Sequence, residues 1–158
     1  MTKTNVMRLL DASGIAYETR EYPWDETDLS GVHAARAIGL PQEQVFKTLV
    51  ARGDRTGPLV FCIPVAESLD LRKAASATGN KRVEMLPLKE LTGLTGYVRG
   101  GCSPIGMKKK FPTCIDETAI LFDTVAVSAG MRGEQIVLSP QALAAFVGAD
   151  FADLTEAG

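Results

Sequence analysis

Apolar and polar residues follow a helical period in some segments of the chain and alternate in others. In residues 5–12, Val6, Leu9 and Leu10 share one face of a helix, Thr4 can cap its start, and Gly14 can end it. The same kind of pattern predicts helices over residues 28–38, 71–78, 87–94 and 140–147. Gly39 and Gly79 follow two of these segments, as expected at helix ends.

Alternating or β-branched runs predict strands between the helices. They cover residues 15–22, 44–51, 59–65, 81–86, 113–117, 124–130 and 135–140. The turn-rich residues 52–58 join the second and third runs into a β-hairpin. Because strands and helices do not alternate regularly, we expect a single α+β domain over residues 1–158. Its sheet should be curved and largely antiparallel, either open and mixed or closed into a barrel, with helices around it.

Composition narrows the class of protein. The chain has 158 residues, of which 46% are hydrophobic and 23% charged, as is typical of a soluble globular protein. It has no apolar run of the ~20 residues that cross a membrane and no signal peptide, so the cytoplasm is the expected location. Three widely spaced cysteines and one histidine give no metal-site spacing, and we expect neither a metal nor a cofactor.

The net charge of −2 argues against a broad surface for gripping nucleic acid, because phosphate contacts supply most of such affinity. Any contact with nucleic acid should therefore be local. Positive charge gathers at Lys81–Arg82 and at Lys108, Lys109 and Lys110, where a solvated patch is the simpler interpretation.

Several single residues allow two interpretations. Lys47 shares a strand face with Val45 and Leu49, so it either extends to water from an edge strand or lies at a pocket rim facing an anionic or carbonyl oxygen. Trp24 is either a packing residue, which we prefer, or an exposed stacking platform. Arg132 is either an anion contact or a turn residue.

The segment VRGGCSPIGMKKKFP, residues 98–112, is rich in glycine around Ser103 and Pro104. It matches neither the P-loop nor the dinucleotide-binding pattern. Glycine permits close approach of the main chain, so free N–H groups in this loop can serve as an oxyanion hole. Cys102 is the one thiol placed to be a nucleophile, but no base lies beside it in the sequence.

Four segments together resemble the YbaK/EbsC family of aminoacyl-tRNA deacylases, which are related to the editing domain of prolyl-tRNA synthetases. They are VFKTLV, LDLRKAASATGNKRVEML, TGYVRGGCSPIGMKK and VSAGMRGEQIVL, in this order along nearly the whole chain. The resemblance implies that Lys47 is the essential lysine and that Gly101, Cys102, Ser103 and Pro104 form the G-x-x-P loop. It also places Ser128, Ala129 and Gly130 in a small-residue turn beside the pocket, and Tyr22, Leu29 and Thr48 in the pocket lining.

The resemblance further implies removal of cysteine from mischarged Cys-tRNA(Pro), and possibly from Cys-tRNA(Cys). The thiol of the substrate would attack its own carbonyl, so Cys102 would not be the nucleophile. Lys108 to Lys110 would lie near the acceptor end of the tRNA, and a prolyl-tRNA synthetase would help to hold it. The oligomeric state is left open.

One position departs from the family pattern. Close relatives carry an aspartate where this chain has Gln135, and a neutral amide cannot accept a proton or pair with an ammonium group. This leaves two alternatives open: a deacylase for another mischarged tRNA such as Ala-tRNA(Pro), and a catalytically silent module that binds RNA or a synthetase.

Overall fold

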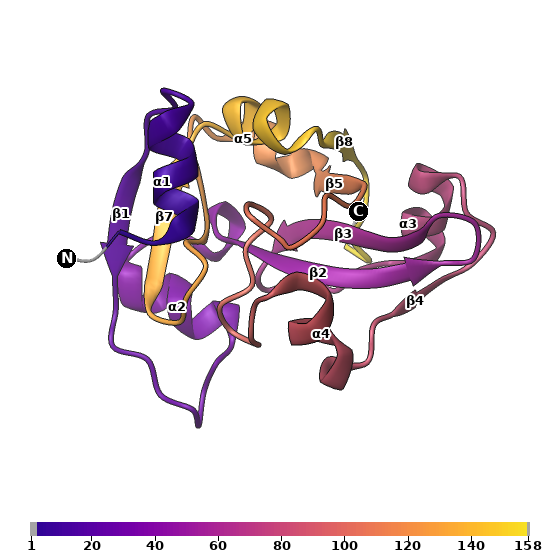
Figure 1. Cartoon of the computed structure of the whole chain (residues 1–158), viewed down its shortest axis with the longest axis horizontal. Helices are drawn as coiled ribbons and strands as arrows, with labels where there is room; N and C mark the ends of the chain where they lie inside the picture. Colours follow the sequence, from indigo (N-terminus) through magenta and orange to yellow (C-terminus); the bar gives the residue numbers. More distant parts are fainter. Residues whose placement is uncertain (1–2, 158) are drawn as a thin grey trace.

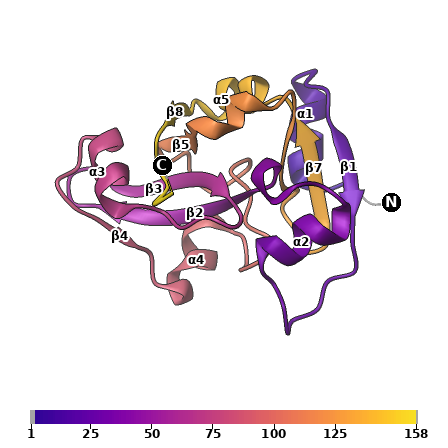
Figure 2. The same ribbon diagram turned by 180° about the vertical axis from the view of Figure 1, so that it is seen from behind.

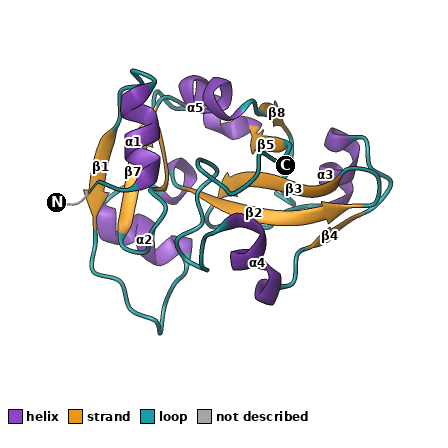
Figure 3. Cartoon of the chain, in the orientation of Figure 1, coloured by secondary structure: helices purple, strands orange, loops and turns teal. Residues whose placement is uncertain are grey.

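The computed structural model describes residues 3–157, which form short helices and two β-sheets (Figure 1, Figure 3). The helices are α1 (Asn5–Ala12), α2 (Gly31–Ile38), α3 (Leu71–Thr78), α4 (Leu88–Thr95) and α5 (Pro140–Val147), with the 3-10 turns η1 (Gln42–Gln44) and η2 (Glu117–Leu121). The strands are β1 (Glu18–Glu21), β2 (Phe46–Gly53), β3 (Gly57–Pro64), β4 (Val83–Met85), β5 (Thr113–Asp116), β6 (Val125–Ser128), β7 (Glu134–Leu138) and β8 (Asp150–Ala152).

The strands form an antiparallel sheet in the order β1-β7-β6 and a mixed sheet in the order β4-β2-β3-β5-β8. Parallel pairing is confined to β3 with β5 and β5 with β8. A bridge between Val45 and Ala126 links the two sheets where β2 begins. The predicted α+β class is confirmed. The prediction of one curved sheet or barrel is corrected, because these strands divide into two sheets and do not close.

The small sheet is covered on both faces. Figure 1 shows α1 in front of β7, and Figure 2, from behind, shows α2 in front of it. Successive side chains of β7 explain this arrangement: Ile136 packs in one cluster with Val6 and Leu10 of α1, whereas Val137 packs in another with Ala35 of α2. The β1–β7 pairing, in which Glu18 lies opposite Val137, joins segments that are far apart in the sequence.

The β2–β3 hairpin pairs the two longest strands of the described chain. Its register places Thr48 opposite Cys62 and Lys47 opposite Ile63. Cys62 belongs to the core beneath α1 and α5, whereas Ile63 belongs to the core beneath α3. The predicted alternation along this strand is therefore confirmed, with Lys47 on the face of Ile63.

Helix boundaries follow the capping residues. α3 and α5 have the predicted bounds, with Asp70 and Ser139 accepting hydrogen bonds from first-turn N–H groups. α2 was predicted to start at residue 28 but starts at Gly31, because the Asp28 carboxylate accepts from the Ser30 N–H and forms a turn first. Strand β8 was not predicted. Within residues 3–157, no helix is long and apolar enough to cross a membrane.

Candidate functional site

A cavity of about 420 Å³ opens between β2, α4, the loop at residues 99–102 and the segment that leads into α2. Residues singled out from the sequence meet in its wall: Tyr22, Leu29, Lys47, Thr48, Cys102, Ser128 and Gln135. They come from six separate stretches of the chain, and β2 supplies the longest run of cavity residues. Lys47 and Arg99 are the charged residues of the described wall, so the cavity is electropositive inside a mainly apolar lining.

Lys47, the second residue of β2, contributes a charge to the wall of this cavity. Its side chain is half-buried, and burial lowers the pKa of the ammonium group, although the carboxylate of Glu67 partly opposes this shift. Among the described residues, no hydrogen-bond or ion-pair partner holds the ammonium group. The positive charge is therefore available to an oxygen atom of a ligand.

The glycine-rich loop reaches the cavity through Gly100 and Cys102. Gly101, between them, already donates its N–H to the carbonyl of Val98 at 3.0 Å. The N–H groups of Gly100 and Cys102 donate to no residue in the described part of the chain. Gly100 has φ +85°, a conformation that glycine adopts without strain. Unlike the amide of Gly101, these two amides have no acceptor within the described chain and can donate to a ligand.

The thiol groups are poorly suited to nucleophilic attack. Burial raises the pKa of Cys102 to about 12, and burial likewise raises that of Cys62 to about 12. Cys62 lies in the core and contacts the Thr48 hydroxyl at 3.8 Å. Within the described chain, His33 forms no hydrogen bond with a thiol. Its backbone N–H donates to the Ser30 hydroxyl, and its ring packs edge-on against that of Tyr22, with 6.4 Å between the ring centroids.

Gln135 presents a buried amide to the cavity. It lies opposite Ser128 in the β6–β7 pair and is only 6% exposed. Its side-chain oxygen has no hydrogen-bond partner in the described structure. A buried acceptor without a partner costs about 1–3 kcal/mol, so a ligand that donates to this atom would recover that cost.

The structure separates other predicted residues from the cavity wall. Ala129 is fully buried in the core, and Gly130 lies against Tyr97. Ser103 is also buried, and its hydroxyl accepts from the Ile105 N–H. Pro104 lines a different hollow of the surface.

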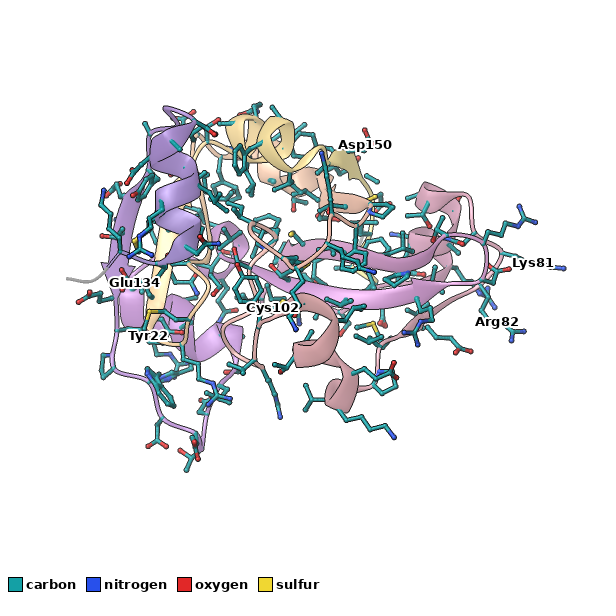
Figure 4. All side chains as sticks on the ribbon, viewed as in Figure 1. Tyr22, Lys81, Arg82, Cys102, Glu134 and Asp150 are labelled. Atoms are coloured by element: carbon teal, nitrogen blue, oxygen red, sulfur yellow. The ribbon has the colours of Figure 1, made fainter. Side chains whose placement is uncertain are left out.

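The three lysines do not form one cluster around the cavity. Lys109 and Lys110 line the same hollow as Pro104. Lys108 lies over Gly96 at the end of α4, where its ammonium group donates to the Gly93 carbonyl at 3.4 Å. The Lys81–Arg82 patch lies at the far end of the β2–β3 hairpin from Cys102 (Figure 4).

Sequence reasoning missed the apolar wall and one cation. Leu88 and Leu91 of α4 lie three residues apart, a spacing that places both on one helix face, and both line the cavity. Arg99 stands within the glycine-rich segment but was not singled out. Its signal was a basic residue directly before two glycines, in a loop already expected to approach a ligand.

Comparisons with known proteins identify relatives of this chain. Residues 29–146 match the family model described as "Aminoacyl-tRNA editing domain". A protein of Enterococcus faecalis named "Putative Cys-tRNA(Pro)/Cys-tRNA(Cys) deacylase EbsC" is 48% identical over 153 residues, which cover 97% of this chain and 93% of the relative.

Two solved structures share the fold. A crystal structure described as a "putative trans-editing enzyme for prolyl tRNA synthetase" is 28% identical, with a TM-score of 0.83, and covers 98% of this chain and 99% of the other. A hypothetical protein with 22% identity and a TM-score of 0.87 matches 97% of this chain and 100% of its own, and shows the fold alone.

Proposed function

Since the chain belongs to the aminoacyl-tRNA editing domain family, we propose that it is a deacylase that removes cysteine from Cys-tRNA(Pro). One observation carries this proposal. The cavity offers cationic groups and unpaired amide donors but no activated nucleophile, which suits a substrate that brings its own reactive group.

An aminoacyl ester needs little activation. As a nucleophile adds to the ester carbonyl, negative charge develops on the carbonyl oxygen, and donors already in position stabilise it. The N–H groups of Gly100 and Cys102 are such donors, and the ammonium group of Lys47 adds positive charge. β2 and the loop hold the backbone of these residues in place before the reaction begins, so little reorganisation is required at that moment.

The nucleophile in this proposal is the thiol of the cysteinyl group. Its sulfur bonds to the carbonyl carbon, the ester C–O bond breaks, and the thiol proton ends on the ribose oxygen of the released tRNA. The cyclic thioester that results is then opened by water. The high pKa of Cys102 supports this assignment, because a neutral protein thiol does not compete with the substrate.

Gln135 provides a place for the α-amino group of the substrate. Its unpaired side-chain oxygen can accept a hydrogen bond from an ammonium group, although it does not supply the negative charge of an aspartate. Alanine and cysteine bear the same α-amino group, so Gln135 serves both equally. Selection of cysteine then rests on the thiol, since an apolar pocket distinguishes a group the size of a methylene by only ~1–3 kcal/mol.

The acceptor end of the tRNA would approach the cavity over α4. Arg99 faces the cavity and Lys108 lies at the end of α4, so both can meet phosphates near the ester. Lys109 and Lys110 would contact the acceptor stem. With a net charge of −2 the chain gains little non-specific affinity, and a prolyl-tRNA synthetase is the partner that would hold the tRNA. Such an enzyme would work in the cytoplasm.

The test is the loss of the ester bond from Cys-, Ala- and Pro-tRNA(Pro), with S-methyl-Cys-tRNA(Pro) as a fourth substrate. We expect Cys-tRNA(Pro) to be cleaved fastest. The S-methylated form should react about 100-fold more slowly or worse, because it loses a positioned intramolecular nucleophile. Equal rates on the cysteinyl and S-methyl forms would refute the thiol mechanism. Faster removal of alanine would identify Ala-tRNA(Pro) as the preferred substrate instead.

A further inference from the structure

A shallow groove lies beside the cavity and shares Tyr22 with it as a common wall. Its other walls are residues 23–24 and the β6–β7 turn at residues 131–134. Figure 4 shows Tyr22 and Glu134 close together, on the opposite side of Cys102 from the Lys81–Arg82 patch. Tyr22 therefore stands between the cavity and the groove, and the two hollows border each other.

Trp24 is the prominent side chain of this groove and the one tryptophan of the chain. It is 45% exposed, so it is not the packing residue that the sequence suggested. The Arg132 guanidinium carbon lies 5.3 Å from the centroid of its ring. A Cβ atom at Gly133 would lie 2.6 Å from Cδ1 of the indole, so glycine at this position lets the ring rest against the turn.

Arg132 ties this aromatic surface to the cavity. Its Nε donates to the carbonyl of Arg99 at 2.9 Å, and Arg99 itself lines the cavity. A guanidinium nitrogen also lies 3.9 Å from a carboxylate oxygen of Glu26. The guanidinium plane is thus positioned by the protein before any ligand arrives, and so is the indole beside it.

We propose that Trp24 and Arg132 form a stacking platform for the nucleobase next to the ester. The proposal rests on the proposed function. The aminoacyl group of a tRNA is esterified to the terminal ribose, so the terminal adenine is one sugar away from the reacting carbonyl. With the ester in the cavity, that base reaches the groove past Tyr22.

The chemistry of the groove favours a base over a phosphate. Glu21 and Glu134 also line it, but Glu134 is buried, and burial and the neighbouring Glu21 raise its pKa. The exposed carboxylate of Glu21 therefore disfavours an anion and can accept a hydrogen bond from an exocyclic amine. An exposed indole and a fixed guanidinium are the groups that stack on bases of single-stranded RNA ends. Lys47 and Arg99 in the cavity are better suited to bind a phosphate.

Because Trp24 is the one tryptophan, its fluorescence reports on the platform directly and without turnover. We expect the trinucleotide CCA RNA to quench this emission in a saturable way, and inorganic phosphate to leave it unchanged. Arg132→Gln should weaken the binding of CCA, whereas Leu121→Ala, an exposed apolar residue elsewhere on the surface, should not. No quenching by CCA, or equal quenching by phosphate, would overturn the proposal.

Kinetics test the same base contact through activity. The measured quantity is the ratio of kcat/KM on cysteinyl-adenosine to kcat/KM on cysteine methyl ester, which lacks a base. Trp24→Ala should lower this ratio by about 5- to 100-fold, the range for losing one base–aromatic stack, and Trp24→Phe should recover most of it. An unaltered ratio in Trp24→Ala would contradict the platform.

The two proposals fail in different ways. If the wild-type chain cleaves neither these esters nor Cys-tRNA(Pro), the proposed function is wrong, and the fluorescence titration alone decides whether the platform binds a base. If both esters are cleaved but CCA does not quench Trp24, the deacylase stands and the platform is refuted.

Discussion

A Cβ atom added at Gly101 would lie 3.0 Å from the backbone nitrogen of Arg132. The glycine-rich loop and the β6–β7 turn therefore touch through their main chains. This contact gives Gly101 a packing role that its place in the G-x-x-P motif did not reveal.

Gly101→Ala should lower both activity and stability. The added methyl pushes the loop from the β6–β7 turn, at a cost of about 1–3 kcal/mol in the free energy of unfolding, and displaces the amide donors of Gly100 and Cys102. Rate and thermal midpoint should fall together. The matched control is Gly93→Ala in α4, where the new methyl meets no neighbouring atom and a helix former replaces glycine. A Gly101→Ala protein with wild-type Tm would argue against this contact.

Lys47→Met should abolish most deacylation while leaving the protein at least as stable as the wild type. Burial penalises the charged ammonium group, so an apolar side chain of similar length removes a cost of folding. Lys47→Arg should not restore full activity, because a planar guanidinium does not replace a compact ammonium group. Lys81→Met, at the far end of the molecule, is the control. Full activity in a folded Lys47→Met protein would remove Lys47 from the mechanism.

The lowered pKa of Lys47 also fixes the sign of a pH effect. Between the folded-state pKa and the ordinary value of 10.5, the unfolded chain binds more protons at this residue, so its contribution to stability improves as pH rises. Activity should change in the opposite direction, because deprotonation removes the charge. Wild type and Lys47→Met should be compared across alkaline pH by thermal unfolding and by reaction rate. Both trends should be absent in the variant.

Cys102→Ala should keep most of the activity on Cys-tRNA(Pro). With its pKa raised to about 12, the thiol is neutral near pH 7 and should react slowly with iodoacetamide, which mass spectrometry can follow. A collapse of the rate in a folded variant would restore a protein nucleophile to the mechanism.

Gln135→Leu should weaken substrate binding without lowering the stability of the fold. The change removes a buried oxygen without a partner and keeps the volume similar, so the thermal midpoint should hold or rise. KM for Cys-tRNA(Pro) should increase, because the substrate ammonium group loses its acceptor. Gln135→Asp, which introduces a charge at this position, should lower KM. If neither substitution alters KM, Gln135 does not contact the substrate.

Local signals predicted the elements well. The Thr4, Asp70 and Ser139 caps and the period of two along β2 were enough to set most boundaries, because these depend on neighbours in sequence. Strand β8 has three residues and lies beside β5 only through tertiary packing, so no local pattern marks it. The division into two sheets likewise depends on pairings between distant segments.

The site was less accessible to prediction than the fold. Tyr22, Leu29 and Thr48 were named from resemblance, and they do lie in the cavity wall. The roles of Gly100, Arg99 and Trp24 depend on which N–H groups are already hydrogen-bonded and on which side chains line the same hollow. The sequence alone does not give these two facts, because they depend on how distant segments pack together.

The β1–β7 pairing determines when the cavity can form during translation. Tyr22 follows β1, and Gln135 lies in β7, more than a hundred positions later in synthesis. Until β7 has left the ribosome, β1 has no partner and the cavity lacks one wall. Pairing of such distant segments is slow to nucleate. A nascent chain should therefore acquire the ability to bind a substrate only after β7 has been translated, when the β2–β3 hairpin has already formed.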